Sequence, residues 1–451
     1  MKLHFLGGAD SVTGSKHWVE MAGTQLLLDC GLFQGFKVLR ERNWQRLPID
    51  PKALDAVILS HAHLDHSGWL PVLVRQGFHG PVIATPATRD LADVLLRDSA
   101  KLQEDDARRA NRGGWSRHAK ALPLYTGADA VRAVSRIRTQ DAGSTQRIGK
   151  VDVSLTPVGH LLGACAVSLR ARGETLVFSG DLGRRDDLLL PPPQRVPRAD
   201  VLLVESTYGN RLHPKDQVEQ QLGEIVRRTI ARGGTVLLPA FAVGRAQALL
   251  LVLQRLRASG GIPRDLPIFL DSPMAIEATT LTRRHRKLLR VSAREITSLS
   301  DGVRFVETGA QSERLSRSRW PSVILSASGM ATGGRVLHHL KALAPQPQHH
   351  VVFAGFQVGG TRGALLAGGA REVKIHGEMV PVRAEVTQLE GLSGHADADE
   401  IVDWLRGFRA PPRQTWVVHG DPAAADALRF RIQQELGWRV AVPEHGQVVE
   451  S

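Results

Sequence analysis

One short segment constrains the fold of this chain more than any other: SHAHLDH, at residues 60–66. It directly follows a short apolar, β-branched run that is predicted to be a buried strand. Crowding three imidazoles and a carboxylate into one turn becomes favourable when divalent cations bind them, since zinc takes imidazole nitrogen and carboxylate oxygen. In an extended turn His61 and His63 point the same way, while Asp65 and His66 can turn toward a second ion. The sequence therefore predicts a dinuclear metal site at a strand end.

The first 205 residues read as a strand-rich α/β arrangement. Short β-branched runs end at polar or glycine-containing turns, as buried strands do, and a helix is predicted over 89–109. Chemically active side chains directly follow or end several of these strands: His61, Asp181 and Glu205. Open α/β sheets bind their ligands at the carboxyl ends of strands, so we expect these residues to converge.

From about Gln217 the sequence shows alternating helix and strand patterns, which predict a parallel sheet with crossover helices. The C-terminal residues return to short strands that end near His395 and His419. We therefore expect one domain made of residues 1–208 and 371–451, interrupted by an inserted domain over 209–370.

Positive charge is concentrated in the predicted insertion. Across the chain, 58 Lys and Arg residues against 45 Asp and Glu residues give a net charge of +13. Residues 209–370 hold 22 of the basic and 10 of the acidic residues, a net charge of +12. A basic segment beside a neutral one is typical of a protein that binds a polyanion, and the alternative is a merely soluble basic surface.

Composition excludes several protein classes. Apolar residues make up 42% of the chain and charged residues 23%, as in ordinary globular proteins. No apolar run approaches the roughly 18 residues of a membrane helix, and the first ten residues do not resemble a signal peptide. Two cysteines, Cys30 and Cys165, are too few for a disulfide framework. We expect a cytoplasmic protein that contacts no membrane.

Other residues are assigned to structural roles. Trp115, Tyr125 and Phe356 are more consistent with core packing than with base stacking, because aromatic residues are only 5% of the chain. His349 and His350 follow a Pro/Gln-rich stretch, and we expect both to be exposed.

The pattern H-x-H-x-D-H over residues 61–66 resembles the signature of the metallo-β-lactamase superfamily. This resemblance implies an αββα sandwich of α/β class and two Zn²⁺ per chain. It also implies ligands at later strand ends: His160 for the first ion, Asp181 as a bridge, and His419 for the second ion. The implied metal ligands are then His61, His63, Asp65, His66, His160, Asp181 and His419. Asp29, in LLLDCG, matches the family's aspartate that orients a ligand or the nucleophile.

Three motifs resemble the β-CASP branch of this superfamily, whose nucleases carry an inserted domain. They are ESTYG with Glu205, SGHAD with His395 and VVHGD with His419. PAFAVGR over 239–245 and GMATGGR over 329–335 are further marks. The resemblance covers essentially the whole chain and implies that the insertion is a parallel-sheet α/β domain. It is closest to RNA-processing members such as the nuclease subunit of the eukaryotic cleavage and polyadenylation factor, whereas the DNA-repair branch usually carries valine at the third motif.

The resemblance also implies catalytic roles. His395 is predicted to donate a proton to the leaving oxygen, because imidazole titrates near neutrality. Glu205 would orient that imidazole and favour its protonated form. Asp65 and Asp29 belong to the predicted catalytic set as well.

Substrate contacts are predicted in the insertion at Arg245, Ser328 and Arg335. Helices that begin beside glycine turns can present backbone N–H groups and an arginine to phosphates. The basic run 283–287 is either a phosphate-contacting patch or a solvated helix face.

Together these features predict a two-zinc phosphodiesterase that cleaves single-stranded RNA in RNA processing or degradation, leaving 5′-phosphate and 3′-hydroxyl ends. Three alternatives stay open: a DNA-processing nuclease of the same family, a small-molecule metallo-hydrolase of the same fold, and an inactive RNA-binding scaffold. The sequence does not decide between endonuclease and 5′-exonuclease action. It also does not decide between a monomer and a homodimer. Relative to the resembled members, we expect no N-terminal RNA-binding extension and no long C-terminal domain.

Overall fold

The protein is described from a computed structural model, which defines residues 1–113, 119–214, 217–355, 357, 359–389 and 391–450. The chain divides into two compact units. Unit 1 consists of Met1–Leu212 and His395–Ser451, and unit 2 consists of His213–Gly394. Each unit has its own sheet structure and its own apolar core.

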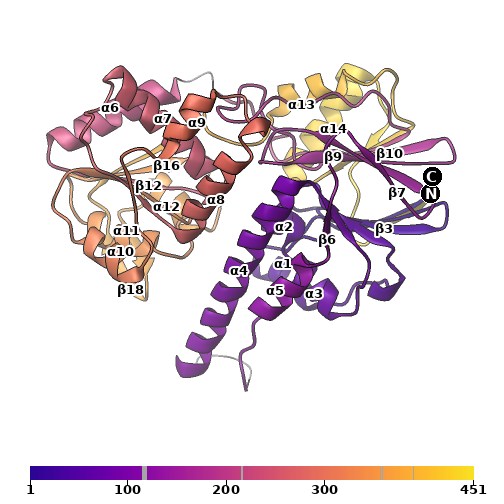
Figure 1. Ribbon diagram of the computed structural model, residues 1–451, viewed down its shortest axis with the longest axis horizontal. Coiled ribbons are helices and arrows are strands. Elements are labelled where there is room, and N and C mark those ends of the chain that lie inside the picture. Colours follow the sequence, from indigo (N-terminus) through magenta and orange to yellow (C-terminus); the bar gives the residue numbers. More distant parts are fainter. Residues whose placement is uncertain (114–118, 215–216, 356, 358, 390, 451) are drawn as a thin grey trace. The chain divides into compact units, whose positions relative to one another are not determined.

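Unit 1 is built from two seven-stranded sheets that face each other (Figure 1). The first sheet contains, in spatial order, β22 (Val448–Glu450), β1 (Lys2–Gly7), β2 (Lys16–Met21), β3 (Thr24–Leu28), β4 (Ala56–Ile58), β5 (Val82–Ala84) and β6 (Ile137–Thr139). The second contains β21 (Val440–Ala441), β20 (Gln414–Val418), β11 (Val201–Glu205), β10 (Glu174–Phe178), β9 (Cys165–Ala171), β8 (Val151–Pro157) and β7 (Thr145–Ile148). Apolar side chains of both sheets, such as Phe5, Ile58 and Phe178, form the core.

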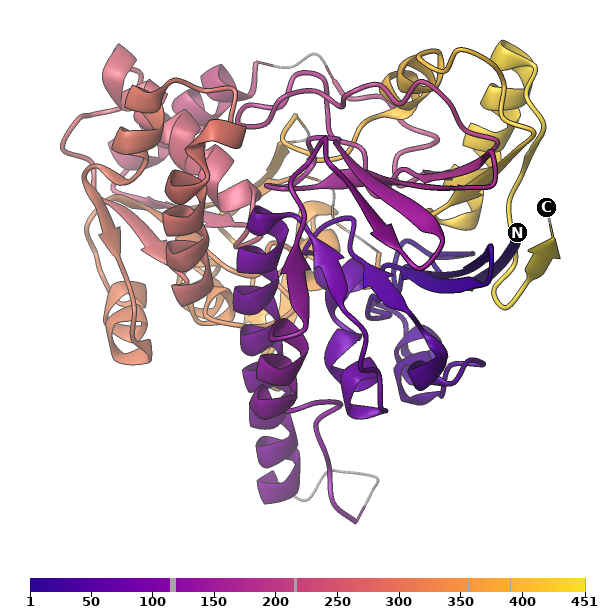
Figure 2. The same cartoon turned by 45° about the vertical axis from the view of Figure 1, so that its right-hand side comes forward.

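Helices cover the outer faces of these two sheets (Figures 1 and 2). On the side of the first sheet lie α1 (Lys37–Glu41), α2 (Leu64–Ser67), α3 (Leu70–Arg75), α4 (Pro86–Gly113) and α5 (Gly127–Val134). On the side of the second sheet lie α13 (Ala398–Leu405) and α14 (Pro422–Leu436). The predicted αββα sandwich is therefore confirmed, and the helix predicted over 89–109 is part of α4.

Unit 2 holds a six-stranded sheet in which neighbouring strands are parallel. Its spatial order is β14 (Val303–Phe305), β13 (Ile268–Asp271), β15 (Ser322–Ser326), β12 (Thr235–Pro239), β16 (His350–Ala354) and β19 (Glu385–Leu389). Its helices are α6 (Val218–Ala231), α7 (Arg245–Ser259), α8 (Pro273–Arg284), α9 (Ala293–Thr297), α10 (Gly309–Ser316), α11 (Val336–Leu343) and α12 (Arg362–Ala367). An antiparallel hairpin joins β17 (Glu372–Ile375) to β18 (Glu378–Pro381). The predicted parallel α/β insertion is confirmed.

Residues 371–394 belong to unit 2, although the sequence assigned them to the closing part of the first domain. The reason is the pairing of β19, which is parallel to β16 over its whole length. A short β-branched run looks the same whichever sheet it joins, so only this pairing decides where β19 belongs.

The burial of the aromatic and histidine side chains can be compared with the predictions made for them. Tyr125 is fully buried, as predicted, while Trp115 and Phe356 lie outside the described residues. The prediction that His349 and His350 are exposed is wrong, because they are 5% and 0% exposed. His350 begins β16, which lies between two other strands of the sheet.

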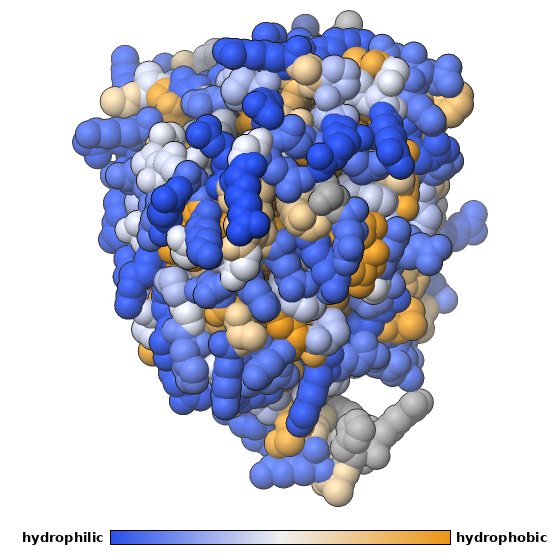
Figure 3. Space-filling model, turned by 90° about the vertical axis from the view of Figure 1, so that its right-hand side faces the viewer, coloured by the Kyte–Doolittle hydropathy of each residue, from blue (hydrophilic) through white to orange (hydrophobic). Residues whose placement is uncertain are grey.

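Among the described helices, none combines the length and the apolar character needed to cross a bilayer. The face in Figure 3 is largely hydrophilic, and its hydrophobic residues form small, separated groups. Such scattered apolar side chains are ordinary for a protein surface.

Candidate metal centre

The SHAHLDH turn follows β4 and leads into α2, and backbone hydrogen bonds hold it against the segment after β3 and against Ser15, which directly precedes β2. The Cys30 N–H donates to the His66 carbonyl at 2.7 Å, and the Leu32 N–H donates to the Leu64 carbonyl at 2.8 Å. The Ser15 N–H donates to the Asp65 carbonyl at 2.8 Å. These bonds give the turn one defined shape, so its side chains are positioned before any ligand binds.

Three residues predicted for the site have left-handed backbones: Asp29 with φ 58°, His160 with φ 53° and His419 with φ 51°. Residues other than glycine rarely adopt this region, and it costs about 1–3 kcal/mol each. Hydrogen bonds hold two of these backbones in place, from the Asp29 N–H to the Ile58 carbonyl at 2.9 Å and from the His419 N–H to the Gly8 carbonyl at 2.6 Å. Such strain concentrates at functional sites.

One cluster brings together His61, His63 and His160 with Asp181. His63 Nδ1 lies 3.1 Å from His61 Nε2 and 3.1 Å from His160 Nε2. Asp181 Oδ2 lies 3.5 Å from the Nε2 atoms of both His61 and His160. Three imidazole nitrogens and one carboxylate oxygen therefore converge on one point.

A second cluster brings together Asp65, His66 and His419. His66 Nε2 lies 2.9 Å from His419 Nε2, which lies 3.7 Å from Asp65 Oδ2. The other oxygen of Asp181, Oδ1, lies 3.3 Å from both His66 Nε2 and His419 Nδ1. Asp181 thus presents one oxygen to each cluster.

The residues of both clusters fit divalent metal ions. Asp181 Oδ1 is buried and accepts no hydrogen bond from the residues that the structure describes. Burial holds the pKa of His61 well below its usual value and lowers the pKa of His63 to about 4, so both rings are neutral and can offer lone pairs. Neutral imidazoles and a bare carboxylate oxygen are the donors that zinc and similar ions require.

Asp29 supports the second cluster from behind. Its Oδ2 lies 2.6 Å from His66 Nδ1, and both side chains are fully buried. Burial acts to lower the pKa of His66, but Asp181 and Asp29 outweigh burial and raise this pKa well above its usual value. With Nδ1 directed at Asp29, the His66 ring presents Nε2 to the cluster, which is how a carboxylate orients a metal-binding histidine.

Two further supporting residues escaped the sequence analysis. The Ser60 backbone N–H and Oγ donate to the two oxygens of Asp29 at 2.7 Å and 2.9 Å. Thr207 Oγ1 lies 3.3 Å from His419 Nδ1. The sequence indicated these two residues only by their positions in motifs: Ser60 is the first residue of the SHAHLDH segment, and Thr207 lies in the ESTYG motif.

Glu205 and His395 form a third group beside Asp181. His395 Nδ1 lies 3.3 Å from Glu205 Oε1 and 3.9 Å from Asp181 Oδ2. The Leu182 and Thr207 N–H groups donate to the two oxygens of Glu205 at 2.7 Å and 3.1 Å, which fixes the fully buried carboxylate. Burial acts to lower the pKa of His395, but Glu205 and then Asp181 outweigh burial and raise it.

Comparisons with known proteins agree with this geometry. The profile of the metallo-beta-lactamase superfamily matches residues 18–233, and the Beta-Casp domain matches residues 246–366. A Zn-dependent metallo-hydrolase RNA specificity domain matches residues 379–443. The chain is 39% identical to Ribonuclease TTHA0252 of Thermus thermophilus, over 95% of each chain. The chain belongs to the β-CASP branch of the metallo-β-lactamase superfamily.

Other β-CASP relatives are longer than this chain. Transcription termination factor FttA of Pyrococcus abyssi is 33% identical over 87% of this chain, and the match spans 61% of that relative's length. A solved protein of unknown function from Enterococcus faecalis shares the fold, with a TM-score of 0.56 at 14% identity over 99% of each chain.

The three predicted substrate contacts lie in unit 2, apart in sequence from the β-CASP metal ligands. Arg245 and Ser328 follow neighbouring parallel strands, β12 and β15, so they lie at the same edge of the sheet. Arg335 stands directly before α11, but its guanidinium donates to Asp271 Oδ1 at 2.8 Å and to the Val306 carbonyl at 2.8 Å. These bonds engage Arg335 within the domain, so a structural role accounts for this arginine without a phosphate.

A glycine, Gly31, sets how closely the SHAHLDH turn approaches the segment after β3. A Cβ atom on Gly31 would lie 1.6 Å from the Asp65 carbonyl oxygen, so Gly31→Ala must push this backbone away. We expect the variant to lose at least about 1–3 kcal/mol of stability, the usual cost of overpacking, and to bind less metal. Thermal unfolding and metal analysis measure both effects. Gly127→Ala is the matched control, because no atom lies within 4 Å of that added Cβ. Unchanged metal content in Gly31→Ala would contradict the argument.

Proposed function

We propose that this β-CASP protein is a two-zinc phosphodiesterase that cleaves single-stranded RNA and leaves 5′-phosphate and 3′-hydroxyl ends. One observation carries the proposal: Asp181 presents one oxygen to each of two buried donor clusters, and His395 lies 3.9 Å from it. RNA nuclease activity is supported by the 39% identity to Ribonuclease TTHA0252.

The donor sets divide naturally between two ions. His61, His63 and His160 would hold the first, Asp65, His66 and His419 the second, and Asp181 both. Two zinc ions at such a site stabilise charge on a phosphodiester and lower the pKa of water, so hydrolysis needs no protein base. The chain's own residues supply the remaining steps.

His395 is the proposed donor of the proton that the leaving 3′ oxygen needs. Cleavage of the P–O3′ bond leaves an alkoxide that must gain a proton, and an imidazole with a raised pKa is protonated near neutrality. Glu205 lies on the Nδ1 side of the ring, so Nε2, on the opposite side, is the proposed donor to the leaving oxygen. Transfer of this proton gives a 3′-hydroxyl on one product, and the phosphate stays on the 5′ end of the other.

Unit 2 is proposed to bind the RNA strand. The basic segment over 209–370, with its net charge of +12, supports a polyanionic substrate. We favour RNA over DNA because His419 is present where the DNA-repair branch usually carries valine. Both cysteines are free and buried, which is consistent with a cytoplasmic location.

End-group mapping tests the proposal. One RNA oligomer, labelled at either end, and a DNA oligomer of the same sequence are incubated with the protein at one ionic strength. We expect cleavage of the RNA alone, with products that a ligase requiring 5′-phosphate accepts directly. Cutting both polymers equally would move the protein to the DNA-processing branch. If neither polymer is cut but small esters are, the small-molecule hydrolase is correct.

A further inference from the structure

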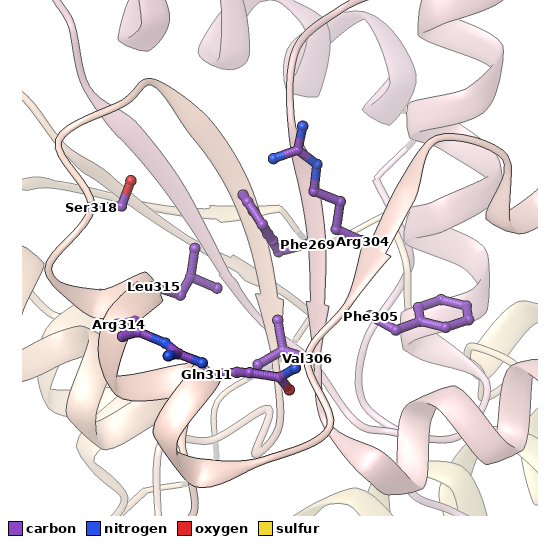
Figure 4. Close-up of a pocket in the computed structure, with 8 residues that line it drawn as sticks. All are labelled: Phe269, Arg304, Phe305, Val306, Gln311, Arg314, Leu315 and Ser318. Carbon is purple, nitrogen blue, oxygen red and sulfur yellow. The ribbon is translucent and has the colours of Figure 1, made fainter.

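A pocket in unit 2 combines aromatic and basic side chains at the edge of the sheet. Its cavity has a volume of about 390 Å³ and is lined by β13, β14, α10 and the residues just after them. Figure 4 shows Phe269, Val306 and Leu315 around the centre of the pocket. Arg304 lies beside Phe269, and Arg314 lies on the side of Leu315 and Gln311. None of the predicted metal ligands or catalytic residues lines it.

The register of the sheet explains how this pocket is built. Phe269 of β13 and Arg304 of β14 are direct partners in the parallel pair, so their side chains leave the same face. The Arg304 guanidinium lies 5.6 Å from the centre of the Phe269 ring, within range of a cation–π contact. Phe305, the next residue, points away from Phe269 (Figure 4), as the alternation of a strand requires.

The two arginines of the pocket are not neutralised. Among the described residues, neither Arg304 nor Arg314 forms a hydrogen bond or ion pair through its side chain, and both are exposed. Asp301, Glu307 and Glu313 are the nearby acidic residues in sequence, and Glu313 is paired with Arg317 at 2.6 Å. An aromatic ring with two uncompensated guanidinium groups around it is complementary to a base flanked by phosphates.

The chain directly after α10 adds further basic and aromatic side chains beside the pocket. It reads Arg317-Ser318-Arg319-Trp320, of which Ser318 lines the pocket. Trp320 is 78% exposed, which is unusual for the largest apolar side chain. Exposed aromatic residues interleaved with arginines are typical of surfaces that bind single strands by stacking.

We propose that this pocket binds one unpaired nucleotide of the RNA substrate, with its base against Phe269 and its flanking phosphates on Arg304 and Arg314. Trp320 stacks on a neighbouring base. The pocket is a second RNA-binding site that does not take part in the chemistry, and it lets the enzyme hold long substrates more tightly than short ones. This inference rests on the proposed RNA cleavage.

The test removes both charges with Arg304→Gln/Arg314→Gln, which breaks no hydrogen bond or ion pair among the described residues and removes only the cation–π contact of Arg304 with Phe269. The matched control, Arg264→Gln/Arg294→Gln, removes two exposed arginines of the same unit that do not line the pocket. Substrates are RNA oligomers of about 4 and about 30 nucleotides, at the lower limit of and well above the roughly 4–16 nucleotides that one single-strand binding domain covers. Binding is measured in a His395→Ala background, and cleavage in the parent.

For the pocket variant we expect about tenfold weaker binding of the long RNA and a salt dependence flattened by about 1.4, for two lost phosphate contacts. Its kcat, and its binding of the short RNA, should equal those of the control. Phe269→Leu, which keeps the apolar packing, should weaken long-RNA binding without changing the salt dependence. A 4-thiouridine oligomer should crosslink to Phe269 or Trp320.

Equal binding of the long RNA by the pocket variant and the control would overturn this inference while leaving RNA cleavage intact. Failure of the parent to bind or cut any RNA would instead overturn the proposed function. The two failures are therefore distinguishable.

Discussion

Asp181→Ala should retain the fold of the protein but lose bound metal and all detectable RNA cleavage. Asp181 is 2% exposed and is the one carboxylate, among the described residues, shared by both histidine clusters. Removing it deletes a ligand of each ion and takes away the one negative charge that both clusters share. Loss of a single transition-state stabiliser costs about 10²–10³-fold in rate, and this variant should exceed that range.

Metal analysis and RNA cleavage are measured together for this variant. The parent should contain about two zinc per chain, and chelation should abolish its activity. Asp186→Ala is the control, because it removes an exposed carboxylate five residues further along the same loop. Asp181→Asn keeps the side-chain volume and shows whether folding is affected. A fully active Asp181→Ala protein, or a parent active after exhaustive chelation, would exclude the proposed centre.

The part of this centre that could be predicted from residues alone is the part that is contiguous in sequence. The SHAHLDH turn can be recognised because its donors are neighbours in sequence, and the buried strand predicted directly before it is β4, Ala56–Ile58. Donors that stand alone, such as His160 and His419, were located only through the family resemblance. Nothing local in the sequence signals their left-handed backbones, and the His419 backbone is held by a hydrogen bond from its N–H to the distant Gly8 carbonyl.

The contact between Arg335 and Asp271 in unit 2 could not be predicted from sequence patterns. Arg335 follows a glycine-rich turn, as phosphate-binding arginines do, yet it donates to the buried Asp271. That contact joins residues on different strands and helices, so it follows only from the strand order β13-β15-β12. His339 also approaches Asp271, with Nε2 2.6 Å from Oδ2, and this completes a buried polar network. An arginine held in this way stabilises the domain, and Arg245 and Ser328 remain the proposed contacts at this edge.

His395→Ala should lower the rate of RNA cleavage by about 10²–10⁴-fold while zinc content and RNA affinity stay at their parental values. The His395 ring is one-fifth exposed, so it can reach a substrate. The fully buried Glu205 carboxylate, beside Nδ1, fixes the orientation of this ring. Removing the ring takes away the proton for the leaving oxygen without deleting a ligand of either cluster. His79→Ala, an exposed histidine in the same unit, is the matched control.

Glu205→Gln separates positioning from proton transfer. The amide keeps the shape of the side chain but cannot favour a protonated imidazole, so kcat should fall while KM and zinc content do not change. An RNA with a good leaving group at the scissile bond should restore much of the rate of both variants, because its leaving oxygen needs no proton.

The competing role for His395 is visible in the geometry, since Asp181, Glu205 and His395 also lie close enough together to hold a cation. If His395→Ala loses a zinc ion but keeps its rate per bound zinc, His395 is a ligand. A proton donor gives the opposite pattern, with full zinc and a slow rate that the good leaving group restores. Zinc content and leaving-group rescue therefore decide between the two roles without reference to the overall loss of activity, which both roles predict.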